Sequence, residues 1–407
     1  MTGQVTDFLN GDFSRSIYVQ RARELVPVLR RRSEKQWQHP RVLDETIADM
    51  QDAGFFQMLQ PRRWGGGETT PIESFEVAAT LAEGEPSVGW VLGVVGIHAY
   101  HLAFFSDQAQ ADVWGKNTKT LISSPYAPGK ATRVDGGYRL SGRWSFSSGS
   151  DHCDWTFLGG NVDNEAAGET ARMSGLPAFT FLLPRSDYEI VHNWNVHGLR
   201  STGSNDLVVK DAFIPEHRAL RWEQVLTNTA PGQQLNNGPL YRLPFFQIFS
   251  RATQPPAALG ALKGMVQSFI DFNAGKVSRH GIHIGQNPQA TLVVAESLSR
   301  VEEMKSQVYK NYARVIAETN GGPSVSIDER RQFRFQASQI GPRCAKYANE
   351  LYRITGGNAI YENQAFGRFL NDLMAIQTHQ LCNYQLHANA WAGSLLGYEE
   401  AAKNYHA

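Results

Sequence analysis

The chain has 407 residues, and its 39 lysines and arginines balance its 39 aspartates and glutamates. This length predicts two or three domains with a large buried core. A formal net charge of zero disfavours a nucleic-acid-binding surface and a polybasic membrane anchor.

The cysteines and the N-terminus bear on the cellular compartment. Cys153, Cys344 and Cys382 form no Cys-x-x-Cys pair, and their odd number argues against a disulfide framework or a zinc ribbon. The N-terminus lacks the basic-then-apolar order of a signal peptide, and no apolar run approaches the roughly 18 residues of a membrane span. We therefore expect a cytoplasmic protein.

Residues 1–120 have the patterns of a helical domain. Thr70–Glu73 is a capping box with proline at the first helical position, so we expect a helix that begins there and ends near Gly84. A second apolar segment, Ser87–Phe105, contains His98. A histidine in such a segment is most often a core residue, so its chemistry stays open at this point.

Short alternating runs separated by Gly, Pro and Asp replace the helical pattern over residues 121–225. Ala178–Leu183 and Asp206–Pro215 are the clearest predicted strands, and the second ends at a proline. The pattern predicts a small β-domain inserted between helices.

Helical patterns return over residues 226–407. Apolar residues keep three-and-four spacing over 298–315. Ser326–Glu329 is another capping box, from which we expect one long helix that ends at the stop signal of Gly356 and Gly357. Four helices with short connections predict a bundle.

Several site types are disfavoured by the sequence. No Gly-x-Gly-x-x-Gly follows a predicted strand, and there is no Gly-x-x-x-x-Gly-Lys-Ser/Thr, so no Rossmann site or P-loop is predicted. The spacing of His280 and His283 could suggest a metal-binding pair, but Gly281 between them weakens helical geometry, and a polar helix end is the alternative. We expect no metal site.

The stretch over residues 141–160 combines aromatic rings with hydroxyl groups. Trp144 and Phe146 continue the alternation of a predicted strand, which would place both rings on one face. Ser147, Ser148 and the glycine after them offer hydroxyls and backbone N–H groups. A flat ligand with polar edges needs this combination, although an ordinary hairpin with a Ser-Gly turn has the same composition.

The whole stretch resembles the flavin-contacting strand of the acyl-CoA dehydrogenase fold, in the form found in the oxygenase components of two-component flavin-dependent aromatic monooxygenases. The resemblance extends from about Phe55 to about Leu396. It implies a mainly helical fold with an inserted β-domain: an N-terminal helical domain, a central β-barrel-like domain and a C-terminal four-helix bundle.

This resemblance implies substrate-binding roles for His98 and Ser124. The string from Gly93 to His98 resembles the segment whose histidine faces the substrate phenol, and Ser123-Ser124-Pro125 resembles the segment that offers a serine to the same hydroxyl. Withdrawal of the phenolic proton enriches the ring in electrons, and a histidine with a near-neutral pKa suits this task.

The resemblance also implies flavin contacts around the central stretch. Ser148, or failing that Ser147, would hold the hydrogen at flavin N5, and Trp144 and Phe146 would flank the isoalloxazine. Arg200, in a segment that resembles a Gly-Leu-Arg-x-Thr-Gly-Ser motif, would meet the flavin or organise its loop, and a charged turn is the alternative.

Further contacts are implied near the C-terminus. Gly356, Gly357 and Arg368 resemble the shared C-terminal flavin contact of the fold, which crosses a subunit interface. Asn371-Asp372 stands where relatives commonly carry Arg-Asp, which puts a contact through Asn371 in doubt.

The residue at position 379 distinguishes a dehydrogenase from a hydroxylase within this fold. Acyl-CoA dehydrogenases carry a catalytic glutamate in this helical neighbourhood, whereas the window Ile376–Leu381 has no carboxylate. We expect His379 and His387 on one last helix. The resemblance implies that His379 approaches the reacting edge of flavin and substrate, and an interfacial helix histidine is the alternative.

Together these features predict a reduced-flavin-dependent monooxygenase. FMNH2 or FADH2 would arrive from a separate NAD(P)H-dependent flavin reductase, and oxygen would pass through a flavin C4a-hydroperoxide to a small aromatic substrate, ortho to a phenolic hydroxyl. A homotetramer is expected from the resemblance. Two alternatives stay open: an oxygenase for indole or another heteroaromatic, and a non-catalytic acyl-CoA-binding relative.

Overall fold

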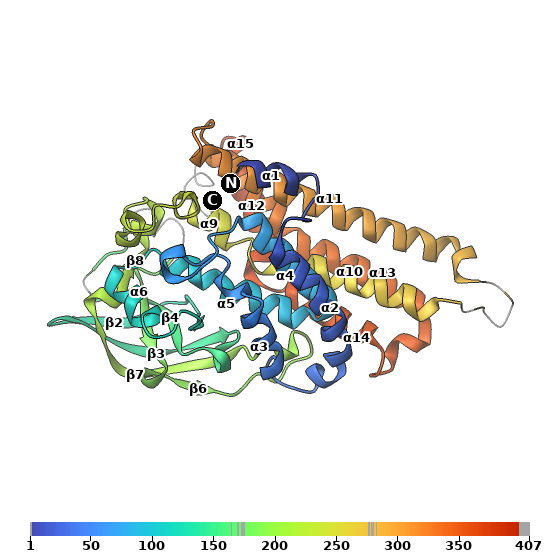
Figure 1. Cartoon of the computed structure of the whole chain (residues 1–407), viewed down its shortest axis with the longest axis horizontal. Helices are drawn as coiled ribbons and strands as arrows, with labels where there is room; N and C mark the ends of the chain where they lie inside the picture. Colours follow the sequence, from blue (N-terminus) through green and yellow to red (C-terminus); the bar gives the residue numbers. More distant parts are fainter. Residues whose placement is uncertain are drawn as a thin grey trace.

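A computed structural model describes residues 2–163, 165–168, 171, 176–275, 277, 281 and 283–398 (Figure 1). His280 therefore lies outside the described residues. The chain forms helices, then a sheet, then helices again, as expected from the sequence. Within the described ranges, none of the helices combines the length and apolarity needed to cross a bilayer.

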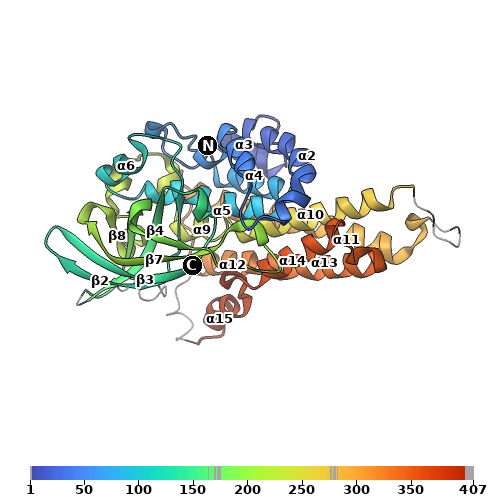
Figure 2. The same cartoon turned by 90° about the horizontal axis from the view of Figure 1, so that it is seen from below.

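The N-terminal region contains six α-helices among the described residues. They are α1 (Thr2–Leu9), α2 (Ile17–Trp37), α3 (Asp44–Asp52), α4 (Pro71–Gly84), α5 (Pro86–Leu102) and α6 (Asp107–Trp114). Thr70 caps α4 by accepting a hydrogen bond from the Glu73 backbone N–H, which confirms the predicted start. Helix α5 is buried along nearly its whole length, because it lies between the sheet and the long C-terminal helices (Figure 2).

The strands form one sheet in the order β6-β7-β3-β2-β4-β5-β8, and β1 pairs with β4. Their bounds are β1 (Ile122–Ser123), β2 (Gly129–Val134), β3 (Gly137–Ser147), β4 (Trp155–Val162), β5 (Phe179–Pro184), β6 (Glu189–Val191), β7 (Asn205–Pro215) and β8 (Ala219–Arg221). Most pairs are antiparallel, whereas β4 is parallel to both β1 and β2. One face of this sheet packs into its own apolar core, which includes Trp144.

The C-terminal region contains the bundle. Its helices are α8 (Trp222–Leu226), α9 (Phe245–Phe249), α10 (Gln254–Asn273), α11 (Pro288–Thr319), α12 (Ile327–Ser338), α13 (Ile340–Thr355), α14 (Ala365–Gln377) and α15 (Tyr384–Leu395). Helices α10, α11, α13 and α14 run side by side and extend away from the sheet (Figures 1 and 2).

Two predictions about this region are wrong. The capping box at Ser326 does start a helix, but that helix ends at Ser338 and a new one begins at Ile340. Pro342 explains the break, because it cannot donate a hydrogen bond to the preceding turn. His379 does not share a helix with His387: it lies between α14 and α15, where its Nδ1 accepts a hydrogen bond from the Leu381 backbone N–H.

Candidate active site

The end of β3 does not continue the regular alternation that the sequence predicts. Pairing with β7 shifts register between Trp144 and Ser147, and Phe146 has a φ of 68°. A β-bulge of this kind inserts an extra residue and turns the following side chain over. As a result Trp144 is buried, Phe146 is 71% exposed and Ser147 is buried again. The prediction that both rings share one face is wrong.

Trp144 packs inside the β-domain. Its indole N–H donates to the backbone oxygens of Ala127, at 2.8 Å, and Gly159, at 3.1 Å. A Cβ on Gly129 would come within 2.1 Å of its ring, so the ring fills this space completely. Trp144 therefore has no free surface for a flavin ring, and its predicted role is corrected to that of a support for the segment after Ser124.

Phe146 lies on the outside of the sheet with Trp194. The two ring centroids are 6.0 Å apart, with the rings nearly perpendicular. The indole N–H of Trp194 donates to the backbone oxygen of Leu199, which ties this pair to the loop before β7. The two rings form an aromatic surface beside the C-terminal end of β3.

The two adjacent serines have different surroundings. Ser148 Oγ accepts a hydrogen bond from Trp90 Nε1 at 3.2 Å and lies 2.7 Å from Ser204 Oγ. Ser147 Oγ is fully buried and has no hydrogen-bond partner among the residues that the structure describes. A buried hydroxyl without a partner costs roughly 1–3 kcal/mol, and a ligand group that reached Ser147 would remove that cost.

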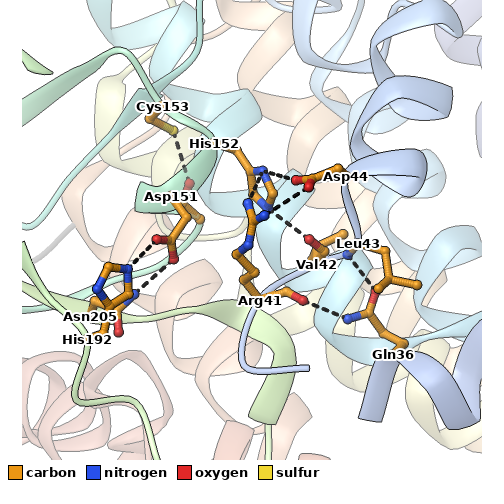
Figure 3. A network of polar contacts seen from close by, with 11 residues as sticks. Gln36, Arg41, Val42, Leu43, Asp44, Asp151, His152, Cys153, His192 and Asn205 are labelled. Atoms are coloured by element: carbon orange, nitrogen blue, oxygen red, sulfur yellow. Dashed lines mark hydrogen bonds and ion pairs between the residues drawn. The ribbon is translucent and has the colours of Figure 1, made fainter. Parts of the chain in front are cut away.

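The turn after the serines is fixed to the N-terminal helices by a polar network (Figure 3). His152 Nε2 donates to the backbone oxygen of Val42 over 2.9 Å. Asp151 accepts hydrogen bonds from Asn205, at 2.9 Å, and from His192, at 2.7 Å. The network holds the end of β3, the start of β7 and the segment before α3 in one arrangement.

The segment that contains Arg200 is fastened to α14. Leu199 has a φ of 50°, and its backbone N–H donates to Asp372 Oδ1 at 2.6 Å. A Cβ on Gly198 would lie 1.9 Å from the backbone oxygen of Asn371, so only glycine allows this approach. Arg200 itself is half-buried in a short 3-10 turn. Asn371 thus contributes its main chain to this contact.

The pKa values of two buried carboxyl groups near that contact, those of Glu85 and Asp372, are raised. Burial and the proximity of Asp372 raise the pKa of Glu85, which stands at the start of α5. Burial likewise raises the pKa of Asp372, although the Leu199 N–H and the Arg368 guanidinium oppose the rise. Both carboxyls are therefore harder to ionise in the folded chain than in an unfolded one.

Trp90 brings His379 together with Ser148. The rings of Trp90 and His379 meet edge to face with centroids 5.4 Å apart, while the Trp90 N–H binds Ser148. Burial lowers the pKa of His379 to about 4. Trp90 was missed by the sequence analysis, because nothing in its apolar helix distinguishes it from a core residue.

His98 and Ser124 lie farther along α5 and β1. His98 Nδ1 is 2.6 Å from the backbone oxygen of Ile122, and a carbonyl oxygen only accepts hydrogen bonds, so Nδ1 carries the proton. Burial lowers the pKa of His98 to about 4, which keeps the ring neutral. Its Nε2 is then a bare acceptor, buried and unpartnered within the described ranges. Ser124 is buried just after β1.

Gly356 and Gly357 are exposed just after α13, and Arg368 is half-buried near the start of α14. Nothing lies within 4 Å of a Cβ added to either glycine. Arg368 Nη1 donates to the backbone oxygen of Glu362 at 2.8 Å. The two glycines are exposed and open to contact with another molecule.

Comparison with known proteins assigns the family. The acyl-CoA dehydrogenase N-terminal domain family matches residues 19–118, and the C-terminal domain family matches residues 252–384. The flavin-dependent monooxygenase oxygenase subunit HsaA of Rhodococcus jostii is 35% identical over 366 residues, which cover 89% of this chain and 93% of that protein. The chain belongs to the oxygenase components of the flavin-dependent monooxygenases.

Other relatives agree with this assignment. The oxygenase component of an FADH(2)-dependent resorcinol hydroxylase from Rhizobium is 31% identical, with 88% of this chain and 89% of that protein covered. The crystal structure of the HsaA monooxygenase from Mycobacterium tuberculosis superposes with a TM-score of 0.86 at 32% identity, covering 93% of this chain and 97% of the other. The expected flavin-dependent hydroxylase class and its fold are confirmed.

The residues present in this oxygenase component fit a flavin. The fold offers an aromatic surface made by the exposed Phe146 and the half-buried Trp194, and an unpartnered hydroxyl at Ser147. A flavin ring system presents both apolar faces and polar edges, and this pair of features meets both needs. Among the described residues, no group of three or more metal-ligating side chains is present.

Proposed function

We propose that this oxygenase component hydroxylates a small phenolic substrate, ortho to its hydroxyl group, with reduced flavin supplied by a separate NAD(P)H-dependent reductase. The observation that carries the proposal is the bare, buried Nε2 of His98. This atom is an acceptor that lacks a donor, and a phenolic O–H supplies one. We further propose that the protein works in the cytoplasm.

His98 acts by polarising the phenol rather than by removing its proton in the resting complex. The pKa of His98 is about 4, whereas a phenol of the tyrosine type titrates near ~10. A hydrogen bond from the phenol to Nε2 still pushes electron density into the ring, and it gains strength as the phenolic proton becomes more acidic during attack. Ser124 would hold the same oxygen from the other side.

The bound reduced flavin would supply the oxygen-activating chemistry, and the protein would hold and seclude it. Ser147 is our candidate for the group that binds N5, because its hydroxyl has no partner among the described residues whereas that of Ser148 already makes two hydrogen bonds. Phe146 would flank the ring. Ser148 and Trp90 would position His379 at the reacting edge.

The remaining flavin contacts would come from Arg200 and from a second subunit. Arg200 stands in the loop that Asp372 holds against α14. Gly356, Gly357 and Arg368 would contact the flavin of a neighbouring copy, since both glycines are exposed. We therefore propose a homotetramer. Its support is the apolar surface around α15, where large side chains are exposed: Tyr384, Leu386, Leu395, Leu396 and Tyr398.

Oxygen uptake with a generic flavin reductase, NADH and a panel of phenols and indoles tests the function. We expect oxygen consumption with a phenol, a product that is heavier by one oxygen atom, and no NADH oxidation when the reductase is left out. Rapid NADH oxidation by this chain alone, or oxygenation of indoles without that of phenols, would contradict the proposal. Light scattering at micromolar concentration checks the tetramer.

A further inference from the structure

Arg251 is a fully buried arginine that the proposed hydroxylation does not use, and it lies between α9 and α10. Its guanidinium lies over two aromatic rings, with Cζ 4.7 Å from the ring centroid of Tyr312 on α11 and 5.7 Å from that of Phe333 on α12. Its Nη2 donates a hydrogen bond to Gln247 Oε1. Its Nε and Nη1 have no partner among the residues that the structure describes. The fold therefore holds a buried cation with two groups of donors unused.

Arg334 lies on the same turn of α12 that Arg251 approaches. Gln247, which accepts from Arg251, donates through Nε2 to the backbone oxygen of Arg330 at 3.4 Å. That oxygen is one helical turn before Arg334, and Phe333 belongs to the same turn. Arg334 is 8% exposed, and its Nε also has no partner within the described ranges. Both guanidiniums thus lie in the region where α9 packs against α12 (Figures 1 and 2).

Neither guanidinium has a counterion in the described part of the chain. Arg330 shows the usual arrangement, with its Nη2 3.6 Å from Glu318 Oε2. No carboxylate among the described residues approaches Arg251 or Arg334 in this way. Burial lowers the pKa of Arg251 to about 10, and burial, followed by the charge of Arg251, lowers the pKa of Arg334 to about 9. Both pKa values lie above neutral pH, so both side chains stay charged.

A buried charge without a counterion is unfavourable, because water solvates a charge better than an apolar surrounding does. The rings of Tyr312 and Phe333 offset part of this cost through cation–π attraction. A water molecule could accept hydrogen bonds from the unpartnered N–H groups, but it brings no opposite charge. An oxyanion does both, since its oxygens accept hydrogen bonds and its charge opposes that of the arginines.

We propose that Arg251 and Arg334 form a binding site for a small oxyanion, a phosphate or carboxylate group, between α9 and α12. The unpartnered Nε and Nη1 of Arg251 and the unpartnered Nε of Arg334 donate to its oxygens. The exposed part of Arg334 marks the side from which the anion enters. The site uses none of the residues assigned to hydroxylation, so the inference stands apart from the proposed function.

Isothermal titration calorimetry with inorganic phosphate tests the site in the full-length protein at neutral pH, with sodium chloride of equal ionic strength as the reference. We expect one phosphate to bind per wild-type chain. Arg334→Met keeps an apolar stem but removes the charge, and it should weaken phosphate binding about tenfold or more, the effect of a lost charge-assisted hydrogen bond. Arg330→Met makes the same change in net charge where Glu318 is the partner, and it should bind phosphate as the wild type does.

Thermal melting gives a second measurement that also reports folding. Phosphate should raise the melting temperatures of the wild type and of Arg330→Met above their values in chloride, because a ligand that binds only the folded state stabilises it. Arg334→Met should show no such rise. Arg334→Lys keeps the charge without the planar fork, so it should bind phosphate with intermediate affinity, and it replaces the methionine variant if that variant does not fold.

Two comparisons identify the source of the anion. Tighter binding of acetate than of phosphate would assign a carboxylate ligand. Loss of phosphate binding in the presence of FMN, but not of riboflavin, would assign the phosphate group of the flavin. Absence of both phosphate and acetate binding in the wild type would overturn the inference, as would equal phosphate affinities of the wild type, Arg334→Met and Arg330→Met. None of these results depends on whether the protein hydroxylates a phenol.

Discussion

The indole N–H of Trp90 donates a hydrogen bond to Ser148 Oγ over 3.2 Å. Ser204 Oγ lies 2.7 Å from the same oxygen, so Ser148 already makes two of the three hydrogen bonds open to a hydroxyl inside the chain. The hydroxyl of Ser147, one residue earlier, is buried with no partner in the described part of the chain. Two serines that look equivalent in the sequence therefore differ in what they offer a ligand.

We predict that Ser147→Ala uncouples oxygen consumption from hydroxylation. The variant should still consume oxygen when reduced flavin is supplied, but it should release most of that oxygen as hydrogen peroxide. Loss of one hydrogen bond is on the order of 1 kcal/mol, which shifts a kinetic partition about fivefold. The ratio of hydrogen peroxide to hydroxylated product measures the effect.

Ser148→Ala is the matched control for this experiment. It leaves the Trp90 N–H without its acceptor, so we expect a lower melting temperature and a smaller change in the peroxide ratio. Strong uncoupling by Ser148→Ala with wild-type coupling in Ser147→Ala would reverse the assignment.

We predict that His98→Ala reduces hydroxylation by about 10²-fold or more, the usual scale for a lost acid–base group. The reason is the loss of the Nε2 acceptor, which the Ile122 carbonyl holds in the reactive tautomer. Flavin affinity, followed by fluorescence quenching, should hardly change. His39→Ala, at an exposed histidine, is the control. Wild-type turnover of the best phenol by His98→Ala would return His98 to the role of a core residue.

Features set by neighbouring residues could be predicted from the sequence. The starts of α4 and α12 follow from the side chains of Thr70 and Ser326, which bind backbone N–H groups three residues away. The change from helical to alternating patterns also marked the β-region, because each periodicity reflects one buried face. These signals are local, and the structure confirms them.

Features that depend on distant residues could not be predicted. The bulge at Phe146 arises from the register of β3 against β7, about 60 residues later in the chain. Trp90 and Ser148 meet across 58 positions. The contact between Asp372 and Leu199 joins residues that are 173 positions apart in the sequence. No local pattern encodes such pairs, so the sequence could not give the direction of the side chains around the bulge.

We predict that Trp144→Phe lowers the free energy of unfolding by about 1–3 kcal/mol, because it leaves the backbone oxygens of Ala127 and Gly159 with fewer donors in a buried site. Chemical denaturation measures this loss. Trp391→Phe, at a half-buried ring near the C-terminus, should cost much less. A Trp144→Phe variant with wild-type stability and weakened flavin binding would restore Trp144 as a flavin contact.

The last prediction concerns the buried carboxyls of Glu85 and Asp372. Both have pKa values raised by burial in the folded chain, whereas an unfolded chain titrates them near ~4. Over the interval between the unfolded and folded pKa values the folded state holds more protons, so stability falls as the pH rises through that interval. The nearby Arg368 guanidinium opposes this trend without abolishing it.

Asp372→Asn isolates this effect, because its amide oxygen can still accept the hydrogen bond from the Leu199 N–H while carrying no charge. We expect the wild-type melting temperature to decline between about pH 5 and pH 8, and the decline to be smaller in Asp372→Asn, since only one carboxyl then titrates. Asp52→Asn, at a mostly exposed side chain, should keep the wild-type profile. If Asp372→Asn shows the full wild-type decline, the ionisation of Asp372 does not oppose the attachment of the Arg200 loop to α14.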